Sequence, residues 1–201
     1  MKRFPDSGRY DPDQIYQPEA DTYLLVEVAQ KEIRSADRVL EIGTGTGYIG
    51  SHLTGYASLI VTDINPHACL AAKEKGLEVI RTDMFDGICG HFDLVIFNPP
   101  YLPTQDDERI VDWLEYALDG GHAGRSTIIQ FVTGVGRILA PGGRVLLLIS
   151  SLTGVEEVIE LFQGNSFSAG IIAKRKIFDE YLLILRCYRM TGDEDEALDR
   201  G

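Results

Sequence analysis

A glycine-rich turn between a predicted strand and a predicted helix constrains the fold of this chain more than any other segment. The apolar run 38–42 indicates a buried strand, and three glycines follow it at alternate positions in the run Gly43-Thr44-Gly45-Thr46-Gly47. Glycines at such a junction permit a tight turn and let a ligand approach the backbone closely. The next predicted strand ends at Asp63, roughly 20 positions after the first glycine, where a carboxylate can accept hydrogen bonds from both hydroxyls of a ribose. The pattern favours an α/β sheet that binds a nucleoside-containing cofactor.

The spacing of the glycines distinguishes this turn from two other nucleotide-binding turns. A dinucleotide-binding turn would need a glycine where Tyr48 stands, and a phosphate-binding P-loop would need a Gly-Lys-Ser or Gly-Lys-Thr sequence, which is absent. With Glu41 before it, the turn resembles motif I of the class I S-adenosylmethionine-dependent methyltransferases. A tight turn without a ligand is the alternative, and the position of Asp63 argues against it.

Predicted strands and helices alternate along most of the chain. The strands are expected at 38–42, 58–63, 77–81, 92–97, 144–149, 168–174 and 181–188, and the helices at 21–33, 48–53, 66–75, 126–139 and 155–162. Asp21 or Thr22 is the expected N-cap of the first helix. Strands separated by helices form parallel units, whereas the last two strands have no helix between them and should pair antiparallel. The prediction is an α/β, Rossmann-like fold with a seven-stranded, mostly parallel sheet and a C-terminal antiparallel hairpin.

The length of 201 residues suits one domain. We expect this domain over residues 1–190, with an N-terminal arm at 1–15 and an acidic, disordered tail at 191–201. The sequence shows no secretory signal and no apolar run long enough to cross a membrane. Three widely separated cysteines, with no Cys-x-x-Cys pair, favour a reducing cytoplasm over a disulfide framework.

The net charge and the spacing of the histidines argue against a duplex-DNA site and a metal site, respectively. The chain has 31 acidic and 19 basic residues, a formal net charge of −12, whereas stable binding of duplex DNA needs clustered Lys and Arg. The four histidines, at positions 52, 67, 91 and 122, show no metal-ligand spacing. We therefore expect no stable complex with duplex DNA and no metal site.

The tetrapeptide Asn98-Pro99-Pro100-Tyr101 follows the predicted strand 92–97, at the end of the strand where open α/β sheets bind ligands. The Asn98 side-chain oxygen and the Pro99 carbonyl can together accept both hydrogens of a planar NH2 group, and Tyr101 offers a flat face to stack on it. Amide and aromatic amino nitrogens are weak nucleophiles, so fixing their N–H bonds can provide most of the catalysis of methyl transfer. A Pro-rich loop that merely follows the strand is the alternative.

These segments together resemble the HemK-like protein-glutamine N5-methyltransferases, and more closely the short archaeal and eukaryotic type that methylates class 1 translation release factors. The resemblance runs from about Ile15 to Arg189. It is carried by 16–25, 41–47, 62–66, Asp83, 98–101 and 120–125. One departure concerns the position of the glutamate. The family usually has Pro-x-Glu-Asp-Thr, whereas this chain has Pro18-Glu19-Ala20-Asp21-Thr22, so the glutamate lies one position earlier.

The resemblance implies S-adenosylmethionine as cofactor and the glutamine of a Gly-Gly-Gln loop on a release factor as methyl acceptor. The implied catalytic residues are Asn98, Pro99, Pro100 and Tyr101. The implied cofactor-binding residues are Thr22, Glu41, Gly43, Gly45, Gly47, Asp63, Ile64, Asp83, Met84 and Asn98. In this resemblance Asp83 pairs with the adenine amino group, Met84 lines the adenine pocket, and the loop 120–125 lies near the substrate entrance.

The resemblance also implies a small zinc-binding activator protein that covers an exposed sheet edge. The predicted strands around 59–61 and 77–80 are candidates for that edge, although both are apolar enough to be core. Two other function classes stay open: an N6-adenine methyltransferase acting on DNA or RNA, and a non-catalytic subunit that keeps the fold. The acidic charge and the lack of a target-recognition domain disfavour the first, and the intact 98–101 motif disfavours the second.

Overall fold

In the computed structural model, which describes residues 9–53, 55, 58–101, 112–121 and 123–190, seven strands form one sheet in the order β3-β2-β1-β4-β5-β7-β6. The strands are β1 (Arg38–Ile42), β2 (Ser58–Asp63), β3 (Val79–Arg81), β4 (Phe92–Phe97), β5 (Leu139–Ser150), β6 (Phe167–Ile177) and β7 (Glu180–Arg189). The first five strands are parallel to one another, and β7 runs antiparallel to β5 and β6. This confirms the predicted Rossmann-like sheet with its C-terminal hairpin.

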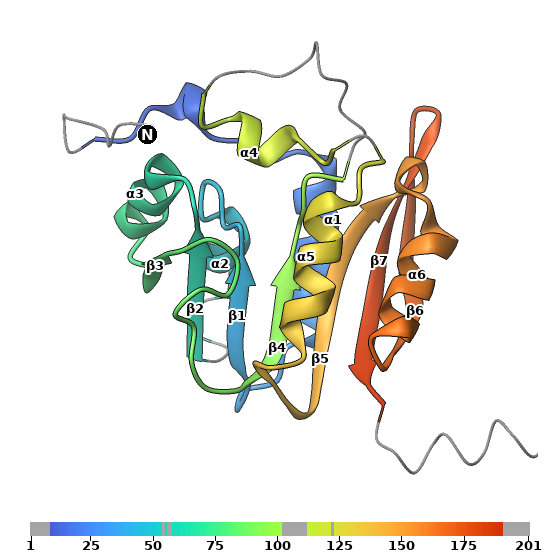
Figure 1. Cartoon of the computed structure of the whole chain (residues 1–201). Coiled ribbons are helices and arrows are strands. Elements are labelled where there is room, and N and C mark those ends of the chain that lie inside the picture. The colour runs from blue at the N-terminus through green and yellow to red at the C-terminus, as the bar shows by residue number, and fades with distance from the viewer. Residues whose placement is uncertain (1–8, 54, 56–57, 102–111, 122, 191–201) are drawn as a thin grey trace, which may run out of the picture.

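Helices cover both faces of the sheet. α1 (Ala20–Glu32), α2 (Tyr48–Leu53) and α3 (Pro66–Glu74) lie on one face, and α5 (Ser126–Val135) and α6 (Val155–Gly164) lie on the other, in front of the sheet in Figure 1. Alternate residues of β4 supply both cores: Leu94 and Ile96 pack with α1 and α2, whereas Phe97 stacks on Phe131 of α5 at 4.9 Å between ring centroids. Burial on both faces explains why the central strands read as continuous apolar runs.

Several predicted boundaries are wrong. The strand predicted at 77–81 begins at Val79, and the strand predicted to end at 174 continues to Ile177. Two other boundaries differ by four residues or more. The helix predicted to reach residue 139 ends at Val135, and β5 begins at Leu139, five residues before the predicted strand. The Pro-Gly-Gly run 141–143, whose composition is typical of a helix end, lies within β5. There Gly142 has φ +73°, and the pairing with β4 shifts between Phe92 and Leu94. The glycines therefore form an irregular stretch of strand instead of a helix end.

The first helix begins before its predicted cap. The N-cap position is Glu19, whose side chain makes no capping hydrogen bond, and Asp21 and Thr22 lie inside the first turn, where both are buried. Neither is the N-cap that we expected. The Asp21 carboxylate is thus available for contacts outside its own helix.

The described part of the N-terminal arm lies against α3. It contains the short helix η1 (Pro12–Gln14), and Ile15 packs on Ala68 and Ala71. The Asp11 N–H donates to His67 Nδ1 at 2.9 Å. Residues 1–8 and the predicted acidic tail 191–201 lie outside the described residues, and the domain boundaries stay a prediction. None of the described helices has both the length and the apolar character needed to span a bilayer.

Candidate functional site

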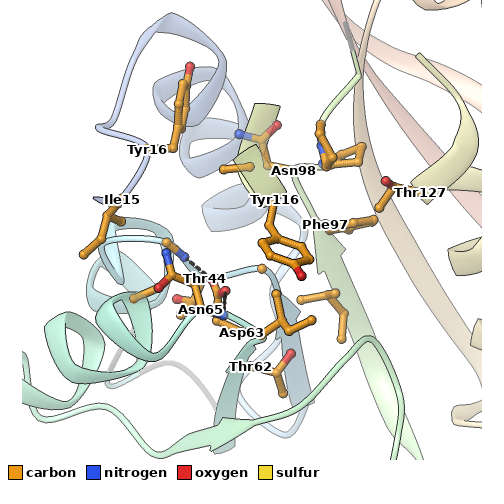
Figure 2. A pocket seen from close by; sticks show the side chains of 18 of the residues that line it. Ile15, Tyr16, Thr44, Thr62, Asp63, Asn65, Phe97, Asn98, Tyr116 and Thr127 are labelled. Atoms are coloured by element: carbon orange, nitrogen blue, oxygen red, sulfur yellow. Dashed lines mark hydrogen bonds between the residues drawn. The ribbon is translucent and has the colours of Figure 1, made fainter. Parts of the chain in front are cut away.

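A cavity of about 530 Å³ lies at the carboxyl ends of β1, β2 and β4, within the size range of small-molecule sites. Figure 2 shows its lining side chains, which come from segments far apart in the sequence. The short helix α4 (Glu115–Leu118) lies above this edge of the sheet (Figure 1), and Tyr116 points from it into the cavity (Figure 2). This is the edge at which open α/β sheets bind ligands.

The glycine turn forms one wall of the cavity. Gly43 and Gly45 have φ values of +65° and +55°, a region that side chains of L-residues rarely adopt. The Gly45 N–H donates to Asp63 Oδ2 at 2.9 Å, and the Asn65 N–H donates to Asp63 Oδ1 at 2.8 Å. Burial raises the pKa of Asp63 to about 6, and these two N–H groups oppose the rise. The carboxyl group is therefore mainly ionised at neutral pH, and it is held at the end of β2 beside the turn.

Two predicted cofactor-binding residues lie behind this wall and do not line the cavity. Glu41 is 1% exposed, and its side chain lies against Gly50 of α2. Burial raises the pKa of Glu41 to about 8, so this acid is mainly protonated at neutral pH. At Gly47, with φ +74°, an added Cβ would lie 2.9 Å from Ala72 Cα. Close packing of the turn on α3 explains this glycine without a ligand, and a cofactor role for both residues stays a prediction.

The other predicted cofactor-binding residues converge on the cavity. Its lining includes Thr22, Gly43, Gly45, Asp63, Ile64, Asp83, Met84 and Asn98. Met84 is held at φ +46°, an uncommon backbone conformation for a residue with a side chain. The predicted catalytic residues Asn98, Pro99, Pro100 and Tyr101 line the same cavity. The fold thus brings the two predicted sets together.

Asp21 fixes the orientation of the Asn98 side chain. Asn98 Nδ2 donates to Asp21 Oδ2 at 3.0 Å, and the Tyr101 hydroxyl donates to the same oxygen at 3.3 Å. The Tyr16 hydroxyl lies 3.2 Å from both carboxylate oxygens. Because a carboxylate only accepts hydrogen bonds, it selects the Nδ2 end of the Asn98 amide. Among the described residues, Asn98 Oδ1 is then left buried without a hydrogen-bond partner in the wall of the cavity.

Both tyrosines that contact Asp21 are neutral donors. Burial, followed by the Asp21 charge, raises the pKa of Tyr16 and of Tyr101 well above the usual range. The Tyr101 carbonyl accepts a hydrogen bond from Thr153 Oγ1 at 3.1 Å, so the end of the 98–101 motif is tied to the segment after β5. The resulting site offers an unpaired amide oxygen beside a pocket that can receive a planar NH2 group.

Sequence reasoning missed several parts of the site. Asp21 was expected to be a helix cap, and no local signal indicates its contact with Asn98, 77 positions away. Tyr16 was part of the family resemblance but had no assigned role. Of the loop 120–125, none of the described residues (120–121 and 123–125) lines the cavity. Arg125 is the N-cap of α5 and donates to the Thr153 carbonyl.

Comparisons with known proteins give a consistent result. A family model described as a methyltransferase small domain matches residues 17–114. A Methanocaldococcus jannaschii protein carrying the name protein N5-glutamine methyltransferase is 36% identical over 185 residues, which span 88% of this chain and 93% of the relative. The human methyltransferase HEMK2 is 28% identical over 196 residues, spanning 89% of this chain and 92% of the relative.

A solved structure of a methyltransferase complex is also similar to this chain. A chain of the E. cuniculi Mtq2–Trm112 complex, which is responsible for methylation of the translation termination factor eRF1, matches with a TM-score of 0.74 and 29% identity. The match covers 88% of this chain and 99% of that chain.

Proposed function

The chain belongs to the HemK-like protein N5-glutamine methyltransferases, and from this premise we propose that it methylates a glutamine side chain of a translation release factor, with S-adenosylmethionine as the methyl donor. The observation that carries the proposal is the Asn98 amide, whose nitrogen is held by Asp21 and whose buried oxygen has no partner in the part of the chain that the structure describes. A buried acceptor without a donor is costly, and the amide NH2 of a glutamine would satisfy it.

The residues of the cavity fit S-adenosylmethionine. Gly43 and Gly45 leave the backbone of the turn open to a ligand, and the Asp63 carboxylate can accept hydrogen bonds from ribose hydroxyls. Asp83 and Met84 would hold the adenine, as the family resemblance implies. When bound, S-adenosylmethionine supplies an electrophilic methyl group on a sulfonium sulfur.

The Asn98–Tyr101 motif would position the acceptor nitrogen. Asn98 Oδ1 would accept one hydrogen of the glutamine NH2 group, and the Pro99 carbonyl would accept the other. Fixing both N–H bonds removes orientational freedom before the reaction and directs the nitrogen towards the methyl group. An alkylated amide nitrogen is acidic, so its proton can leave without a strong general base. The mechanism therefore assigns no role to a histidine or a cysteine.

The release factor is supported as substrate by the E. cuniculi complex, which acts on eRF1. That relative is part of a two-chain assembly, and we propose that this chain also takes a small activator subunit. The edge strand β3 is the candidate contact. β2 lies between β1 and β3 and belongs to the interior of the sheet, whereas β3 ends the strand order and its Ile80 is 39% exposed. An unpaired strand edge is a ready site for pairing with another chain.

Two matched substitutions test the activator edge. We expect Ile80→Asp to weaken co-purification of the chain with a Trm112-type subunit from the same organism. Ile171→Asp is the control, because Ile171 is exposed to a similar degree, at 47%, but lies on β6 at the opposite edge of the sheet. Equal retention of the subunit by both variants would move the contact away from β3.

The function itself is tested by methyl transfer from labelled S-adenosylmethionine. The acceptors are a release factor, the same factor with its loop glutamine changed to alanine, and an adenine-containing oligonucleotide, each with and without the activator subunit. We expect label on the unaltered factor alone, and we expect Asn98→Ala to abolish it even at a cofactor concentration that saturates the variant. Label on the oligonucleotide would favour an N6-adenine methyltransferase. Bound cofactor with no transfer to any acceptor, even with the activator, would indicate a non-catalytic subunit.

A further inference from the structure

The tip of the β6–β7 hairpin carries an aromatic side chain that packing does not explain. Phe178 is 92% exposed and has φ +48°. It occupies the first position of a two-residue loop, because Ile177 pairs with Glu180 across the hairpin. A positive φ at this position is typical of glycine in such loops. Phe178 thus combines a disfavoured backbone conformation with an apolar ring in water, and such outliers concentrate at functional sites.

The hairpin tip lies on the same side of the molecule as the cavity, beyond the carboxyl ends of the parallel strands. β7 runs antiparallel to β5 and pairs Leu182 with Ser150 at the carboxyl end of β5. Figure 1 shows the tip projecting beyond this edge, at the upper right of the molecule. In the strand order β4-β5-β7-β6, two strands separate β6 from β4, the strand that leads into Asn98.

Hydrogen bonds join the first residues of β7, directly after the hairpin loop, to the 98–101 motif. Ser150 Oγ donates to the Glu180 carboxylate, and the Tyr181 N–H donates to Ser151 Oγ at 3.0 Å. The short helix η3 (Ser151–Thr153) continues from there, and its last residue, Thr153, donates to the Tyr101 carbonyl at 3.1 Å. The tip is therefore held in a fixed position relative to the motif that would bind the acceptor amide.

The surface around the tip has the composition of a protein contact. Leu152 of η3 is 59% exposed, and Tyr181 is partly exposed with Lys174 Nζ 4.0 Å from its ring centroid. Aromatic side chains are enriched at the centres of protein–protein interfaces, where a few of them provide most of the binding energy. Phe178 is the most exposed of the large apolar side chains in the described residues.

We propose that Phe178 docks the folded acceptor protein, by inserting its ring into an apolar depression on the acceptor outside the loop that carries the glutamine. This inference rests on the proposed function. An acceptor whose glutamine reaches Asn98 must lie over the carboxyl ends of the parallel strands. The hairpin tip projects beyond these ends. The proposed activator edge at β3 is at the other end of the strand order, which disfavours the activator as the occupant of the tip.

The test is Phe178→Gly, assayed in the full chain with its activator subunit. Glycine suits the positive φ, so we expect an unchanged or higher melting temperature. With the folded release factor, KM should rise about tenfold while kcat stays within about twofold, in line with the loss of one central aromatic contact. With a short peptide containing the Gly-Gly-Gln loop, kcat/KM should not change. The separate variant Phe178→Tyr should have a KM for the folded factor close to that of the unaltered chain, because it keeps the ring.

Ile171→Ala is the matched control, since Ile171 is exposed on β6 of the same hairpin but far from the tip. It should alter neither substrate. An unchanged KM of Phe178→Gly for the folded factor, or an equal loss with factor and peptide, would overturn the docking role and leave the proposed function intact. If the unaltered enzyme methylates neither substrate, the proposed function fails, and the docking role fails with it.

Discussion

Replacing Asp21 by asparagine should reverse the Asn98 amide and slow methyl transfer. The Thr22 N–H donates to Asp21 Oδ1, so in the variant an oxygen stays at this position and the new NH2 group takes the place of Oδ2. That NH2 group then faces Asn98 Nδ2, and two donors oppose each other. Asn98 relieves the conflict by turning its oxygen towards residue 21, which points its NH2 group at the acceptor.

The magnitude follows from the cost of restoring the productive orientation. Turning Asn98 back breaks one hydrogen bond and leaves a donor unpaired, together about 1.5–3 kcal/mol. Such a cost lowers the rate about 10- to 150-fold. We expect this loss in kcat with a Gly-Gly-Gln peptide, measured with saturating S-adenosylmethionine. The cofactor Kd should change by less than about threefold, because Asp21 contacts the acceptor side of the cavity.

A double-mutant cycle decides whether Asp21 acts through Asn98. In an Asn98→Ala background, Asp21→Asn should have little further effect, since the amide that it orients is gone. Glu27→Gln is the matched control, because this exposed carboxylate of the same helix pairs with Arg175 and does not line the cavity. Full kcat in Asp21→Asn, or losses that multiply with those of Asn98→Ala, would refute the positioning argument.

Three further predictions concern the glycine turn and the acids beside it. The pKa of Glu41 is raised from 4.5 to about 8, so the folded state keeps a proton that the unfolded state releases. The free energy of unfolding should therefore fall as the pH rises from about 4.5 to about 8, and Glu41→Gln should flatten the dependence of the melting temperature on pH. Asp63→Ala should weaken S-adenosylmethionine binding about 10- to 150-fold by calorimetry, and the affinity of the unaltered chain should drop as pH falls through about 6, where Asp63 gains its proton. A pH-independent affinity would contradict the assigned role of this carboxylate. Gly47→Ala combines a positive φ with a 2.9 Å approach to Ala72 Cα and should cost about 2–5 kcal/mol in the free energy of unfolding, measured in urea.

Much of the fold could be predicted because the relevant signals are local. The strands 38–42, 58–63 and 92–97 have the predicted bounds, since each apolar run ends at polar or glycine residues. The antiparallel hairpin followed from the absence of a helix between its strands. The start of β5 could not be predicted in this way, because Pro141-Gly142-Gly143 has the composition of a helix end. Its membership of the strand depends on pairing with β4.

The site was predictable in its motifs but not in its contacts. The positions of Asp63 and Asn98 follow from the ends of parallel strands, which meet at one edge of the sheet. The role of Asp21 depends on a hydrogen bond to a residue 77 positions away, which a local pattern does not encode. The sequence also marks Phe178 only as an aromatic residue between two strands, and its exposure and positive φ appear in the folded chain alone.

Site-resolved mass spectrometry of a release factor after a single turnover tests the central claim most directly. We predict one methyl group on the side-chain nitrogen of the Gly-Gly-Gln glutamine with the unaltered chain, and none with Asn98→Ala at equal cofactor occupancy. A methyl group on another residue, or an unchanged yield with Asn98→Ala, would contradict the account.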